Sequence, residues 1–162
     1  MSMHTGRSSA MILAAVLAVA GAAPAGAADG VKAGHLKCDV AGNVSFIFGS
    51  SRDIDCMYTP AGSKRIDHYT GKVKQFGVDI GYQSSGVILW AVVAPSSDVG
   101  PGGLAGEFAG GAADIAAGYG VGANALFGGS DKAVALQPVS VEGIEGINVA
   151  AGIGVLTLHA KK

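Results

Sequence analysis

The chain is poor in the residues on which most catalytic and binding sites depend. Aromatic residues make up 6% of its 162 residues and charged residues 14%, with four histidines, two cysteines and one tryptophan. The formal net charge is -1 and no basic stripe occurs, which argues against a nucleic-acid partner. Hydrophobic residues nevertheless reach 49%, so the chain can bury a core and is not a disordered polypeptide.

The sequence signatures of catalytic and cofactor sites are also missing. There is no Walker loop and no Gly-x-Ser-x-Gly nucleophile elbow. The glycine-spaced run at 118–122 lacks the helix pattern and the later acid of a dinucleotide fingerprint. No His-x-x-x-His pair is present, and Asp53 and Asp55 supply too few oxygen ligands for a calcium loop. We therefore expect no cofactor, no metal and no enzymatic activity.

The alternative hypothesis is that the protein is an enzyme. Asp67 and His68 are adjacent and could act as a proton-transfer pair, with Ser50 as a hydroxyl in the same pocket. Under this hypothesis the protein is a hydrolase-like enzyme with a pocket around His68 and Asp67. Only the fold would assemble such a pocket. The competing reading of the two residues is a solvated turn.

The N-terminus has the three-part pattern of a secretory signal peptide. A short polar segment with Arg7 precedes an apolar run at 10–20, and Ala25, Gly26 and Ala27 form an A-x-A cleavage site. The apolar run is shorter than the roughly 20 residues of a spanning helix. We expect residues 1–27 to be removed, residues 28–162 to form one β-rich domain, and the protein to be exported to the periplasm or outside the cell.

Export makes the two cysteines interpretable. Cys38 and Cys56 allow only one intramolecular pairing, and a disulfide is the expected state in an oxidising compartment. The rival readings are a metal site, which would need two further ligands, and a reactive thiol.

The pattern of the remaining chain predicts an all-β fold. Short apolar or alternating segments are separated by turn signals, which indicates a single antiparallel sandwich or small barrel of about eight or nine strands. The expected strands are 31–40, 44–48, 54–59, 66–80, 87–94, 133–141 and 147–158, with polar turns at 41–43, 49–53 and 81–86. Pro138 predicts a sheet edge or a bulge. Trp90 is expected to anchor the core, with a partner for its indole N–H.

Residues 100–129 form a glycine- and alanine-rich stretch. A short helix is conceivable at 103–117. If the stretch continues as a strand, one face at Gly118, Gly120 and Gly122 is bare backbone, which a ligand can approach closely. We therefore treat these glycines and Asn124 as candidate ligand-binding residues, for a lipid or a small apolar molecule. The alternative is structural: side chains from a facing layer fill the groove, or the glycines let a barrel bend.

Several runs resemble the bacterial family called domain of unknown function 992, over nearly the whole mature chain. The runs include CDV at 38–40, FIFGSS at 46–51, HYTG at 68–71, FGVDIG at 76–81 and GVGAN at 120–124. The resemblance implies a small exported protein with a signal peptide and the same two cysteines, and it implies no activity.

Residues 118–129 are also similar to the glycine-rich strand of the SYLF family, whose members bind phosphoinositide lipids or sit in the bacterial envelope. Together, these observations predict a non-catalytic structural or binding module of the envelope. They do not specify its partner or its oligomeric state.

Overall fold

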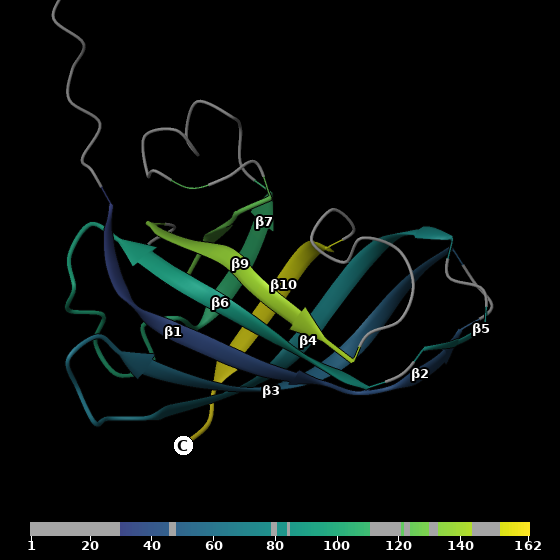
Figure 1. The fold of residues 1–162 in the computed structure, drawn as a ribbon, viewed down its shortest axis with the longest axis horizontal. Helices are drawn as coiled ribbons and strands as arrows, with labels where there is room; N and C mark the ends of the chain where they lie inside the picture. Colours follow the sequence, from purple (N-terminus) through teal and green to yellow (C-terminus); the bar gives the residue numbers. More distant parts are fainter. Residues whose placement is uncertain are drawn as a thin grey trace, which may run out of the picture.

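The computed structural model describes residues 30–45, 48–78, 81–83, 85–110, 121, 124–129, 133–143 and 153–162. Within them all helical or sheet structure is β, which confirms the expected fold class (Figure 1). The ten strands are β1 (Val31–Val40), β2 (Asn43–Ser45), β3 (Phe48–Pro60), β4 (Asp67–Val78), β5 (Gly81–Gln83), β6 (Gly86–Ala94), β7 (Gly106–Gly110), β8 (Leu126–Gly128), β9 (Val134–Glu142) and β10 (Ile153–Ala160).

Eight of these strands close into an antiparallel barrel. Their order around it is β1-β3-β4-β10-β7-β8-β9-β6, so the barrel, rather than the sandwich, is the architecture formed. Strands β2 and β5 form a separate two-stranded sheet. This small sheet keeps the register of the β1–β6 ladder, because Val40 pairs with Gly86 and, after a break, Asn43 pairs with Gln83. It lies at the opposite end of the barrel from the 61–66 and 95–105 connections (Figure 1).

Strand β3 corrects the expected turn at 49–53. These residues are continuous with the rest of β3, and their ladder with β4 includes the pairs Arg52–Val73 and Asp53–Lys72. The polar composition Gly-Ser-Ser-Arg-Asp suggested a turn, but pairing along the full length of β4 overrides such local preference. The expected turn at 81–86 is likewise partly strand, because β5 occupies its first half.

The barrel interior is occupied by large side chains from every side. Inward and outward positions alternate along β1 and β6, as a half-buried strand requires. Trp90 lies in this core with 1% of its surface exposed, which confirms its expected role as a core anchor. The largest fully buried side chains are Trp90, Arg52, Tyr58, Tyr69, Phe108, Leu36, Ile88, Leu104, Leu126, Leu136, Leu156 and Leu158.

Two glycines mark places where neighbouring strands approach unusually closely. A Cβ on Gly71 of β4 would overlap the carbonyl oxygen of Thr157 on β10. A Cβ on Gly128 of β8 would overlap the carbonyl oxygen of Glu107 on β7. Only glycine fits at such contacts, so both positions serve the closure of the barrel.

Pro138 sits at a bulge. The β6–β9 ladder shifts register between Leu89 and Trp90, where Trp90 pairs with Pro138. The bulge reading is therefore confirmed. The edge reading is wrong, because β9 pairs with both β6 and β8.

Residues 106–110 of the segment in which a short helix was considered form strand β7. Residues 103–105 of that segment form turn and irregular structure, and 111–117 lie outside the described residues, as does the first half of the strand expected at 147–158.

Candidate functional site

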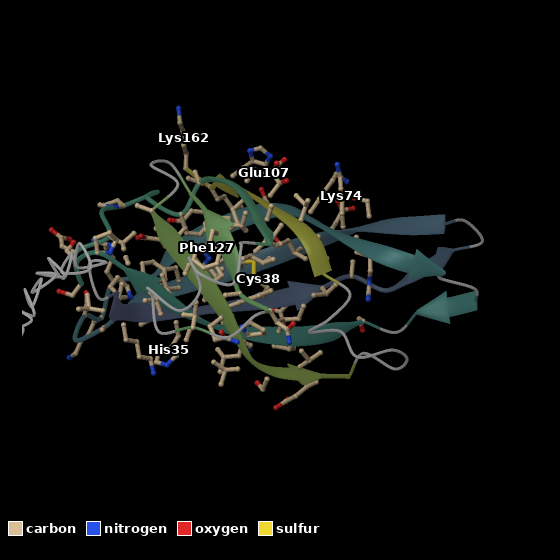
Figure 2. The ribbon with its side chains drawn as sticks, turned by 90° about the horizontal axis from the view of Figure 1, so that it is seen from above. His35, Cys38, Lys74, Glu107, Phe127 and Lys162 are labelled. Carbon is tan, nitrogen blue, oxygen red and sulfur yellow. A yellow bond between two sulfur atoms is a disulfide. The ribbon has the colours of Figure 1, made fainter. Side chains whose placement is uncertain are left out.

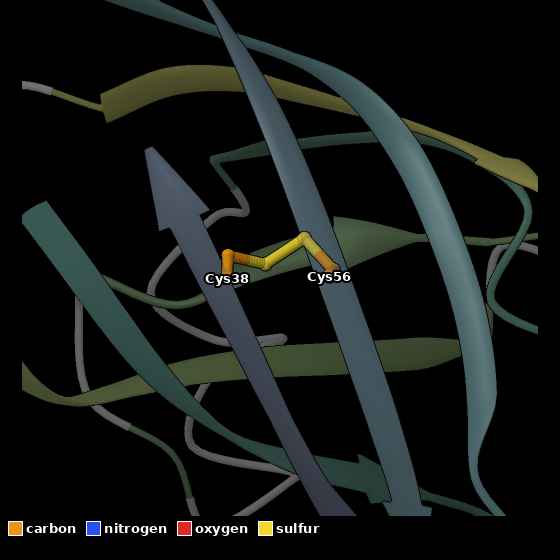
Figure 3. The surroundings of a disulfide bond; sticks show 2 residues. All are labelled: Cys38 and Cys56. Carbon is orange, nitrogen blue, oxygen red and sulfur yellow. A yellow bond between two sulfur atoms is a disulfide. The ribbon is translucent and has the colours of Figure 1, made fainter. Parts of the chain in front are cut away.

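The disulfide joins two neighbouring strands of the barrel. Cys38 on β1 is directly opposite Cys56 on β3, with a Cα–Cα distance of 4.1 Å and an S–S bond of 2.08 Å (Figure 3). Both residues are buried, and Figure 2 places Cys38 within the body of the barrel. The expected disulfide is confirmed. The metal and reactive-thiol readings are excluded, because both sulfur atoms are used in the bond.

The structure separates Asp67 from His68. Adjacent residues of a strand point to opposite faces, and both residues belong to β4. The Asp67 side chain is only 12% exposed and contacts Arg65, whereas His68 is exposed on the outer face of the barrel. The two side chains therefore form no proton-transfer pair.

Ser50 is far from both residues. His68 pairs with Met57 across the β3–β4 ladder, and Ser50 lies seven residues further along β3. Seven residues of strand correspond to about 23 Å. The three residues considered for a hydrolase-like site are thus not brought together.

Asp67 belongs instead to a polar cluster at one end of the barrel. Arg65 Nε lies 3.1 Å from Asp67 Oδ1, and Arg65 Nη2 donates a hydrogen bond of 2.6 Å to the backbone oxygen of Val99. On the same connection, the Leu104 N–H donates to Tyr69 Oη at 3.4 Å. Val99 and Leu104 are both buried in the core. The 95–105 connection is therefore a stopper that closes this end of the barrel, and Arg65 and Tyr69 hold it.

Burial raises the pKa values of the two tyrosines beside this stopper, Tyr58 and Tyr69. Tyr58 is fully buried and donates a hydrogen bond of 2.9 Å to the backbone oxygen of Ala33. Burial raises the pKa of Tyr58 to about 12, although Arg65 acts in the opposite direction. Burial also raises the pKa of Tyr69. Both groups remain neutral at physiological pH and act as hydrogen-bonding core residues.

Two other polar groups lie inside the barrel. Arg52 is 2% exposed, and its Nε donates a hydrogen bond of 2.8 Å to the backbone oxygen of Ala41. Trp90 Nε1 is buried without an acceptor in the described part of the chain, contrary to the expectation that its N–H would find one. A buried donor that lacks an acceptor costs about 1–3 kcal/mol of stability.

The glycine-based ligand site stays a prediction. Gly118, Gly120 and Gly122 lie outside the described residues, and Asn124 is exposed in the turn before β8. Within the same glycine-rich stretch, Gly128 serves the close approach of strands, which agrees with the structural reading at that position.

Sequence reasoning missed a groove on the outer surface of the barrel. The groove has a volume of about 500 Å³ and crosses β3, β4 and β10. Its lining residues are Asp53, Ile54, Asp55, Thr70, Gly71, Lys72, Lys74, Thr157 and His159. Strand alternation at 66–80 could have placed Thr70, Lys72 and Lys74 on one face. The turn expected at 49–53 hid Asp53, the carboxylate that pairs with Lys72.

A smaller hollow of about 140 Å³ adjoins His68, with Asp39, Asp55 and Lys161 in its lining. Across the portion of the chain that the structure describes, no three His, Cys, Asp or Glu side chains are grouped so that they could hold a metal ion. The described residues also contain no helix long and apolar enough to cross a membrane.

Comparison with known proteins places the chain in a family. A family model described as protein of unknown function (DUF992) matches residues 16–159, which is nearly the whole chain. The chain belongs to this family. No curated protein and no solved structure matches it. DUF992 carries no assigned activity in its description, so the molecular role of this member has to be argued from its own residues.

Proposed function

We propose that this DUF992 member is an exported, non-catalytic protein of the bacterial envelope that acts as a structural or binding module. The observation that carries the proposal is the Cys38–Cys56 disulfide inside the barrel core. A buried disulfide that links two core strands is typical of proteins that fold in an oxidising compartment. The signal-peptide pattern at 1–27 supports the same destination.

The non-catalytic part of the proposal rests on the separation of the candidate catalytic residues. Asp67 is engaged by Arg65, His68 faces outward and Ser50 lies roughly 23 Å further along the neighbouring strand. A general base needs to lie within hydrogen-bond reach of the group it activates. This arrangement supports a binding role over the hydrolase-like alternative.

Export is tested by expressing the full chain with its own N-terminus in a Gram-negative host. We expect the periplasmic fraction to contain protein that begins near Ala28 and carries no free thiol. Full-length protein with two free thiols in the cytoplasmic fraction would overturn the proposed destination.

The identity of a carried ligand is tested by native mass spectrometry of the exported protein against its denatured mass. An added mass that is lost on denaturation would support the predicted lipid or apolar ligand at Gly118, Gly120, Gly122 and Asn124. A mass equal to that of the bare disulfide-bonded chain would count against that ligand.

A further inference from the structure

The outer groove across β3, β4 and β10 has a polar lining that is ordered along the strands. Asp55 pairs with Thr70, and Thr70 pairs in turn with His159, which forms one row across the three strands. The parallel row contains Asp53, Lys72 and Thr157. Lys74 lies beyond both rows, four residues along β4 from Thr70. The groove therefore has an acidic end at Asp55 and a basic end at Lys74.

The charges at the two ends are free to bind a ligand. Lys72 and Asp53 satisfy each other, since Lys72 Nζ donates to Asp53 Oδ1 at 2.6 Å. Among the described residues, the side chains of Asp55 and Lys74 have neither an ion pair nor a hydrogen bond, and both residues are exposed. Figure 2 shows the Lys74 side chain projecting away from the barrel into solvent. Hydroxyl groups of Thr70 and Thr157 lie in the lining between these ends.

This lining suits a ligand that carries charges of both signs. A simple anion would meet the carboxylates of Asp53 and Asp55 beside the lysines, and a simple cation would meet the lysines. Sugars and bases usually stack on large aromatic rings, and the groove lining contains no Phe, Tyr or Trp. A zwitterion places an ammonium group at Asp55 and an anionic group at Lys74, so that each charge meets its opposite.

The separation of the two ends sets the length of the ligand. Four residues along a strand correspond to about 13 Å. An extended peptide of four residues spans a similar distance, about 13–14 Å. Its termini supply the required ammonium and carboxylate, and the threonine hydroxyls can hydrogen-bond its backbone.

We propose that the β3–β4–β10 groove binds short extended peptides with free termini, the N-terminal ammonium at Asp55 and the C-terminal carboxylate at Lys74. The proposal deepens the binding role proposed above and rests on it. The Lys72–Asp53 pair lies in the groove between the two ends, so the peptide passes over it, and His159 lies in the same row as Asp55 and Thr70.

The test uses tetra-alanine as the probe, titrated into the disulfide-bonded protein and followed by amide chemical shifts. We expect saturable binding with a dissociation constant on the order of 1 mM, because an exposed groove supplies few buried contacts. The shifts should cluster at residues 53–55, 70–74 and 155–159. N-acetyl-tetra-alanine and tetra-alanine amide, each lacking one charge, should bind about three- to fivefold more weakly.

Variants assign each terminus to its residue. Lys74→Gln should weaken tetra-alanine about three- to fivefold and should leave the binding of tetra-alanine amide unchanged. Asp55→Asn should likewise weaken tetra-alanine about three- to fivefold and should leave the binding of N-acetyl-tetra-alanine unchanged. Lys32→Gln is the matched control, because Lys32 is an exposed lysine on β1 outside the groove, and it should change neither affinity.

Two sets of outcomes separate this inference from the proposed function. Absence of saturable binding, equal binding of the capped peptides, or shifts elsewhere on the barrel would each overturn the groove assignment alone. Cleavage of tetra-alanine during the titration, seen by mass spectrometry, would overturn the non-catalytic role. Intact peptide bound in the groove supports both.

Discussion

Arg65 ties the stopper of the barrel to the β3–β4 connection through a single hydrogen bond, from its Nη2 to the backbone oxygen of Val99, 34 residues further along the chain. The same guanidinium contacts Asp67, whose side chain is nearly buried. The pair therefore couples two segments that are distant in sequence at one end of the barrel.

Removal of Arg65 should loosen the stopper. Arg65→Ala leaves the Asp67 carboxylate and the Val99 carbonyl without the guanidinium, and we expect a loss of about 1.5–3 kcal/mol in the free energy of unfolding. Urea unfolding measures this loss, and hydrogen exchange should be faster at the Gly103 and Ala105 amides, which donate within the stopper. Lys64→Ala, a change at the neighbouring exposed position, is the control and should be nearly neutral. Equal effects of the two substitutions would contradict the role of Arg65.

The disulfide should stabilise the fold and resist reduction. The bond closes a loop with a sequence separation of 18 residues, for which the chain-entropy model gives about 3 kcal/mol. A Cys38→Ala, Cys56→Ala double variant should lose that amount of unfolding free energy. Urea unfolding of the disulfide-bonded protein and of the cysteine-free variant measures the difference.

The burial of both cysteines adds a kinetic expectation. Glutathione should reduce the native protein only as fast as the barrel opens, and reduction should accelerate when urea is added. Rapid reduction of the folded protein without urea would show that the sulfur atoms are reachable and would contradict the buried geometry.

The sequence predicts the features of this structure that depend on neighbouring residues better than those that depend on contacts between distant segments. The strands at 31–40 and 87–94 were predicted closely, because alternation and β-branched content act locally. The pairing of Cys38 with Cys56 followed from their number. Strand β3 was cut short because its polar half, 49–53, is held by pairing with β4, and single-sequence propensity does not register such tertiary contacts.

The candidate site was harder to predict for the same reason. The divergence of Asp67 and His68 follows from strand alternation alone, once both are placed on β4. The groove depends on the register of three strands, and β10 joins β4 from 75 or more residues away in sequence. Register and barrel closure are set by packing at positions such as Gly71, which local patterns do not report.

Alkaline pH should destabilise the protein through Tyr58. Its pKa is about 12 in the folded state and 10.0 in the unfolded chain, so the folded state binds the phenolic proton more tightly. The stabilising contribution is therefore complete below pH 10 and is lost as the pH rises from 10 towards 12, by about 2–3 kcal/mol in all. Unfolding free energies measured at pH 9, 10 and 11 should fall accordingly.

Tyr58→Phe provides the comparison for this pH dependence. The variant loses the hydrogen bond to Ala33 at every pH, but its stability should fall less steeply above pH 10 than that of the unsubstituted protein. Identical slopes for the two proteins would show that Tyr58 does not cause the alkaline loss.

Gly71 offers the sharpest test of how the barrel closes. A methyl group at this position would overlap the carbonyl oxygen of Thr157, and backbone atoms on both strands would have to shift. We expect Gly71→Ala to cost more than 3 kcal/mol, or to prevent folding, because overpacking against backbone cannot be relieved by a rotamer change.

The matched control for Gly71 is Gly110→Ala, because Gly110 is also a strand glycine and its added methyl group would meet nothing within 4 Å. Its effect should stay within about 0.5 kcal/mol. If Gly71→Ala fails to fold, the double variants that add Lys72→Ala or Thr157→Ala should fail to fold as well. The added methyl group clashes with the main chain, which neither second substitution moves. Rescue by shortening either side chain would show that side-chain packing, and not the approach of β4 to β10, sets the requirement for glycine.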